Sequence, residues 1–218
     1  MLFHIYERYV VPASVLIPLF IAFINYKYLG TSLKIIFAFL VFSGIVNTAA
    51  QILAEHKISN LFIFHIYSIF EFGFISWFYK IQLKAPVTKI ILVLIILFTV
   101  ACIINFIFIQ NNIEFNTYTR PIEALIIIGY CALFFNQQSQ ADNGEKWADI
   151  SLNWINTSFL IYFAGSFFTF IFSNYLLTAG KHINNIVWGS YYIILIAENI
   201  LFSVGFYRCR KQPITSFY

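Results

Sequence analysis

The stretch NLFIFHIYSIFEFGFISWFYK, residues 60–80, decides the fold class, because it is long enough to cross a bilayer and carries Glu71 near its middle. A charged side chain at the centre of a bilayer costs about 3 kcal/mol, so such groups usually face the interior of a helix bundle. A turn of 100° per residue places six polar side chains within an arc of about 160°: Asn60, His65, Ser68, Glu71, Ser76 and Tyr79. This pattern predicts a transmembrane helix with one polar face turned toward other helices.

The composition extends this interpretation to the whole chain. Of 218 residues, 61% are hydrophobic and 10% are charged, and apolar runs of about 20 residues recur. These values are typical of an all-α, polytopic membrane protein, here a single domain over residues 1–218. The net charge of +4 does not indicate a nucleic-acid partner, because the basic residues lie in short loops between spans, where lipid topology explains them.

We expect seven transmembrane helices, which places the two termini on opposite sides of the membrane. The predicted spans are 9–27, 34–53, 60–79, 88–109, 119–136, 152–173 and 186–207. With the N-terminus outside, nine Lys and Arg residues lie on the cytoplasmic side and four lie outside. The excess of cytoplasmic positive charge predicts an outer N-terminus and a cytoplasmic C-terminus.

Two parts of the sequence resemble each other. HKISNLFIFHIYSIFEF at 56–72 aligns with KHINNIVWGSYYIILIAEN at 181–199, and each segment leads into a Glu-x4-Ser step. The similarity predicts two parallel repeats of three helices, residues 1–80 and 119–207, joined by a linker helix at 88–109. In that arrangement Glu71 and Glu198 are symmetry mates. Chance similarity between Phe- and Ile-rich helices is the alternative.

The polar residues inside the spans predict a binding pocket that opens to the outer side. Its candidate residues are Glu71, Glu198, His65, Asn47, Gln51, Asn105, Tyr191, Glu123 and Arg120. Two carboxylates in an apolar core repel each other unless they bind a cation, a proton or a basic group, so the guest is a cation, a proton or a hydroxyl-rich molecule. The alternatives are a proton-sharing glutamate pair and, for His65, a hydrogen-bonded bundle histidine. Arg120 and Glu123 either form an interfacial ion pair or, with Arg120 at the rim, admit a zwitterion.

Several kinds of chemistry find no support in the sequence. The seventh span lacks the lysine that a retinal Schiff base needs, and His65 is the one histidine inside a span, too few for a zinc hydrolase. The three cysteines form no paired pattern, and no catalytic motif is present. We therefore predict no catalytic residue, no metal ligand and no cofactor.

The arrangement of three, one and three helices resembles the sugar-transporting SWEET and PQ-loop families, although the chain has no Pro-Gln dipeptide and few of their hinge prolines. The segments WINTSFLIYFAGSFFTFIFSNYL at 154–176 and WGSYYIILIAENILFSVGFY at 188–207, with residues 60–79, resemble small bacterial seven-helix membrane proteins that accompany sensor histidine kinases. The second resemblance implies location in a bacterial inner membrane and signal perception with output through another protein.

The leading hypothesis is a seven-helix membrane sensor whose outward-facing pocket binds an unknown small ligand and signals to a cytoplasmic partner. Residues 136–151 and 208–218, the sizeable polar segments on the predicted cytoplasmic side, are expected to contact that partner. A transporter of small solutes or ions is the first alternative, and a membrane-embedded enzyme is the second. A transporter needs a polar path to both faces, whereas an enzyme needs a nucleophile, base or metal in place.

Overall fold

The computed structural model describes residues 6–110, 113–140 and 146–211, and within these ranges the chain is built of helices without a strand. Seven helical segments are long and apolar enough to cross a membrane. In chain order they are η1 (Tyr6–Val10) with α2 (Val11–Ser14) and α3 (Leu16–Ile24), α4 (Thr31–Glu55), α5 (Leu61–Gln82), α6 (Val87–Ile104) with η3 (Asn105–Ile109), α7 (Thr119–Gln140), α8 (Ser151–Leu176) and α9 (Lys181–Arg208). The short helices η2 (Tyr26–Tyr28), η4 (Trp147–Asp149) and η5 (Cys209–Lys211) lie between or after them. The predicted all-α membrane fold with seven spans is confirmed.

The first span is broken by its two prolines. A proline lacks the N–H that a helix uses to bond the carbonyl four residues earlier, so Pro12 leaves the carbonyl of Arg8 free and Pro18 leaves that of Ser14 free. The chain is π-helical up to Val10, and a turn separates α2 from α3. Gln51 on α4 donates a hydrogen bond to the freed Arg8 carbonyl at 3.3 Å. The break therefore attaches the first span to α4.

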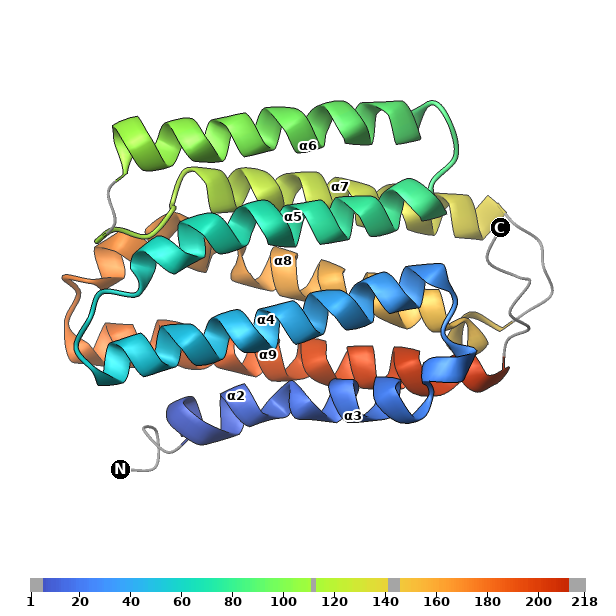
Figure 1. Cartoon of the computed structure of the whole chain (residues 1–218), viewed down its shortest axis with the longest axis horizontal. Helices are drawn as coiled ribbons and strands as arrows, with labels where there is room; N and C mark the ends of the chain where they lie inside the picture. The colour runs from blue at the N-terminus through green and yellow to red at the C-terminus, as the bar shows by residue number, and fades with distance from the viewer. Residues whose placement is uncertain (1–5, 111–112, 141–145, 212–218) are drawn as a thin grey trace.

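The helices run alternately along one axis, with the described ends of the chain at opposite ends of the bundle (Figure 1). α5 packs on α4, α6 and α7, while α8 packs on α7 and α9. The first span lies mainly against α9 and makes few contacts with α4. α4 and α9 consequently face each other across a space that the first span borders.

The half of the bundle nearer to Arg208 is tightly packed. Phe159 of α8 lies at its centre, with ring centroids 5.3 Å from Phe202, 6.0 Å from Phe78 and 6.4 Å from Phe39. Some polar groups here are paired locally: the Tyr79 hydroxyl donates to Asn156 Oδ1 at 2.6 Å, and both side chains also contact Cys131. Since Phe39, Phe159 and Phe202 are buried, they form an aromatic floor across α4, α8 and α9.

The predicted cytoplasmic contact surface lies only partly within the described residues. α7 continues to Gln140 and η4 follows at Trp147–Asp149, so part of the stretch expected to be irregular is helical. Residues 141–145 and 212–218 lie outside the described residues. The two parallel repeats and the outer position of the N-terminus stay predictions.

Candidate functional site

A cavity of about 1580 Å³ occupies the half of the bundle nearer to residue 6. Its lining comes from the first span and from α4, α5, α7, α8 and α9, and it ends at Phe39 and Phe202 of the aromatic floor. The volume of this cavity exceeds the usual 300–1,000 Å³ of small-molecule sites. Six of the nine predicted site residues line it: Asn47, Gln51, Glu71, Arg120, Tyr191 and Glu198.

An ion cluster forms one wall of the cavity. The Arg120 guanidinium donates through Nη1 to Glu71 Oε2 and, at 2.9 Å, to Glu123 Oε2. Its carbon Cζ lies 4.5 Å from the ring centroid of Phe170. The side chains of Glu71 and Glu123 are 3% and 0% exposed, and that of Arg120 is 11% exposed. A charged triad that is this deeply buried is stable only because each member has a partner.

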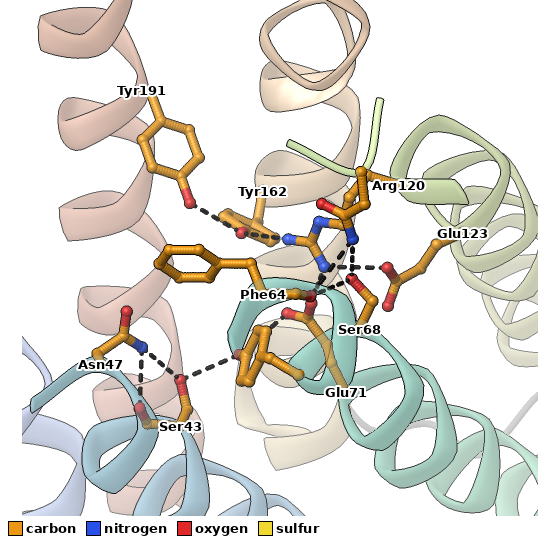
Figure 2. A network of polar contacts seen from close by, with 11 residues as sticks. Ser43, Asn47, Phe64, Ser68, Glu71, Arg120, Glu123, Tyr162 and Tyr191 are labelled. Atoms are coloured by element: carbon orange, nitrogen blue, oxygen red, sulfur yellow. Dashed lines mark hydrogen bonds and ion pairs between the residues drawn. The ribbon is translucent and has the colours of Figure 1, made fainter. Parts of the chain in front are cut away.

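Tyrosine hydroxyls extend the ion cluster across the bundle, as Figure 2 shows. Arg120 Nη2 donates to the Tyr162 hydroxyl at 3.1 Å, and that hydroxyl lies 3.1 Å from the hydroxyl of Tyr191 on α9. On the other side, Tyr67 donates to Glu71 at 3.2 Å and lies 3.1 Å from Ser43 on α4. One connected network thus joins α4, α5, α7, α8 and α9 around the cavity.

Glu198 faces the same cavity but stands outside this network. The residue is 7% exposed, and its carboxylate makes no ion pair or hydrogen bond within the described part of the chain. Its backbone carbonyl accepts a hydrogen bond from Ser158 at 2.9 Å, which fixes α9 against α8 at this point. The structure therefore presents a buried carboxyl group whose hydrogen-bonding capacity is unused.

A re-entrant segment between α6 and α7, residues 113–118, explains why Arg120 reaches mid-depth. Asn116 is buried and donates to Ser68 Oγ and the Phe64 carbonyl of α5. Asn174 of α8 bonds both the N–H and the carbonyl of Phe115, at 2.7 and 3.0 Å. Irregular backbone at membrane depth is tolerated where protein satisfies its polar groups in this way. α7 consequently begins inside the bundle (Figure 1).

Three predicted site residues lie outside the cavity lining. His65 Nε2 donates to the Glu114 carbonyl at 3.0 Å, and Asn105 donates to Gln110, which donates to Thr117. Through these bonds, His65 and Asn105 hold the re-entrant segment. For His65, this geometry corresponds to the alternative of a hydrogen-bonded bundle histidine. Glu123 lies behind Arg120 as its ion-pair partner.

Arg120 is the residue whose position differs most from expectation. The sequence predicted that Arg120 lies near the outer end of the fifth span, either in an interfacial ion pair with Glu123 or at the rim of the pocket. The structure places it in the interior, because the re-entrant segment carries the start of α7 inward. Tyr67 was missed altogether, although its spacing of i, i+4 from Glu71 puts both on one helix face.

The mouth of the cavity is bordered by charged residues of η1. Arg8 pairs with Glu55 of α4 at 2.6 Å, and Glu7 accepts a hydrogen bond from Tyr192 of α9 at 2.6 Å. All four residues line the cavity. Glu7 and Arg8, which are neighbours in η1, thus bond to α9 and α4 on opposite sides of the mouth.

A second side of the cavity reaches the lipid-facing surface between α3 and α4. The lining includes Leu16 of α3 and Ile45 of α4, which are 61% and 64% exposed. Both side chains are apolar and lie on helices that the composition places in hydrocarbon. The cavity therefore combines a polar interior with an apolar side opening.

Comparison with protein-family models, with curated proteins and with solved structures found no match for this chain. Within the described residues, no group of three or more His, Cys, Asp or Glu side chains is placed to hold a metal ion. The functional argument consequently rests on the geometry of the cavity.

Proposed function

We propose that this membrane protein is a ligand-binding receptor with a pocket accessible from the side of residue 6. The observation that carries the proposal is a cavity that ends at an aromatic floor within the bundle, next to an unpartnered buried carboxyl group. A binding site needs one entrance, whereas a transport path must reach the second face. The packed half beyond Phe159 favours binding over passage.

The hydrogen-bond network supports a signalling role. Five helices meet around the cavity through side chains of Ser43, Tyr67, Arg120, Tyr162 and Tyr191. A ligand that competes for one of these bonds changes the contacts between helices, which is the physical requirement for a conformational response. Transmission to a cytoplasmic partner is part of the proposal and follows the predicted topology.

Cysteine labelling in sealed liposomes tests the one-sided pocket. The three native cysteines are replaced by alanine, and a single cysteine is introduced either at Asn47, which lines the cavity, or at Ser76, which is fully buried and outside the lining. A membrane-impermeant thiol reagent should modify Asn47→Cys from the side of residue 6 alone and should leave Ser76→Cys unmodified. Modification of Asn47→Cys from both sides would contradict the receptor proposal and favour the transporter.

A further inference from the structure

We propose that the ligand of this pocket is an organic ammonium ion with an apolar substituent, bound with its positive charge beside the Glu198 carboxylate. The inference rests on the proposed function, because it requires that the cavity be a binding site. It adds the chemical class of the ligand and the residue that selects it.

The charges around the cavity do not balance. The buried carboxyl groups of the described interior belong to Glu71, Glu123 and Glu198, and the buried guanidinium that faces them is Arg120. Arg120 uses Nη1 for two carboxylates and Nη2 for Tyr162, and within the described residues it makes no hydrogen bond or ion pair with Glu198. A bound cation would pair the remaining carboxylate, and pairing is what a charge at this depth requires.

Aromatic side chains line the same cavity as Glu198. Tyr67, Tyr162 and Tyr191 are among them. Phe202 borders it from the floor, and Trp188 packs against Tyr191 with ring centroids 5.6 Å apart. A carboxylate combined with several aromatic faces is the arrangement that recognises ammonium groups through ion pairing and cation–π attraction.

The same surroundings argue against other ligand classes. An anion would meet an unpaired carboxylate, and Arg120 already bonds to two carboxylates. A divalent cation such as Ca²⁺ takes six or more oxygen ligands, and among the described residues no group of three or more His, Cys, Asp or Glu side chains is placed to supply them. A hydroxyl-rich ligand needs free polar groups along its length, but the hydroxyls of Tyr67, Tyr162 and Tyr191 already bond within the network. Leu195 and Phe202 of the lining carry no polar group.

The side opening accounts for the apolar substituent. Leu16 and Ile45 continue the cavity to the lipid-facing surface, so a hydrocarbon group attached to the ammonium would remain in an apolar environment. Burial of such a group is favourable by about 25 cal/mol per Å² of apolar area relative to water. The cavity volume leaves room for a ring or a chain beside the ammonium group.

A series of three probes that share a 2-phenylethyl group and differ in charge tests the role of the charge. 2-Phenylethylamine is cationic at neutral pH, 2-phenylethanol is neutral, and 3-phenylpropanoate is anionic. Binding to the purified full chain in nanodiscs is measured by the rise in unfolding temperature and by the change in tryptophan fluorescence, to which Trp188 of the cavity lining contributes. We expect the amine to stabilise the protein and the other two probes to have little effect.

Two matched variants remove one carboxylate each. Glu198→Gln should weaken amine binding by about tenfold or more, equivalent to at least about 1.4 kcal/mol. Asp149→Asn makes the same chemical change at the other end of the bundle, where Asp149 pairs with Arg208 at 3.0 Å, and should leave the dissociation constant within about twofold.

Each outcome of the experiment decides the ligand class. Stronger binding of the alcohol or the carboxylate, or amine binding that survives Glu198→Gln, would overturn the ammonium assignment while leaving a pocket in place. The ammonium assignment would also be overturned, with the pocket left in place, if none of the probes bound and Asn47→Cys were nevertheless labelled from the side of residue 6. Labelling of Asn47→Cys from both sides would instead overturn the receptor proposal.

Discussion

The two halves of the bundle differ although they are built from the same helices. Toward residue 6, the helices enclose a cavity, and their polar side chains join in one network around Arg120. Toward Arg208, aromatic rings around Phe159 fill the space, and polar groups such as Tyr79 and Asn156 are paired locally. The comparison indicates that packing holds one half together, whereas a few charged and hydroxyl contacts hold the other.

Gly205 and Gly44 show the same contrast at atomic scale. A Cβ at Gly205, in the packed half, would lie 2.6 Å from Cδ1 of Ile155 and 3.3 Å from the carbonyl oxygen of Ser151. A Cβ at Gly44, which lines the cavity, would meet nothing within 4 Å. Small residues permit close approach of membrane helices, and here they do so between α8 and α9.

The largest effect is expected from removing the charge at the centre of the network. Arg120→Leu leaves Glu71 and Glu123 buried without a cation, which should cost about 3 to 5 kcal/mol of unfolding free energy. The measurement is denaturant unfolding of the protein in mixed micelles. The triple variant Arg120→Leu, Glu71→Leu, Glu123→Leu should recover most of the loss, because no buried charge is left unpaired. A loss below about 1 kcal/mol for the single variant would show that the network does not hold this half together.

A slightly smaller loss is expected when the aromatic floor is removed. Phe159→Ala should cost about 3 kcal/mol, because the ring is fully buried and its neighbours cannot collapse into the space. Phe64→Ala is the matched change in the other half, and we expect about 1 kcal/mol, because that ring already borders the cavity. Equal losses in the same unfolding assay would contradict the proposed difference in packing.

The two glycines provide a milder test of the same difference. Gly205→Ala should destabilise the protein by about 2 kcal/mol, since Ile155 must move and the Ser151 carbonyl is too close. Gly44→Ala should leave stability unchanged or raise it by about 0.5 kcal/mol through the higher helix propensity of alanine. Thermal unfolding of both variants side by side checks the sign of each change.

The smallest change in stability is expected at Glu198. Glu198→Gln removes an unpaired buried carboxyl group without breaking a hydrogen bond, so without ligand the unfolding free energy should stay unchanged or rise by less than about 1 kcal/mol. Glu71→Gln breaks a buried ion pair and should cost about 2 kcal/mol. If the two substitutions had the same effect in the unfolding assay, the glutamates would be equivalent, as the predicted repeat implies.

The sequence predicted the seven spans because hydrocarbon length and apolar composition are local properties. It also predicted that Glu71 and Glu198 avoid lipid, since the cost of a charge in hydrocarbon depends on the residue alone. Six of its nine candidate residues line the cavity for the same reason, because a polar side chain within an apolar span avoids lipid by facing the bundle interior.

The partners of those residues were decided by tertiary structure. Whether Glu71 meets Glu198 or Arg120 depends on where α7 begins, and that depends on hydrogen bonds from Asn116 and Asn174 to segments far away in the chain. No local pattern encodes such bonds, because an asparagine in a loop has many possible partners. The sequence by itself determined that this protein has a polar interior within a membrane bundle, whereas only the packing of the re-entrant segment determined which glutamate is neutralised and which one faces the cavity unpaired.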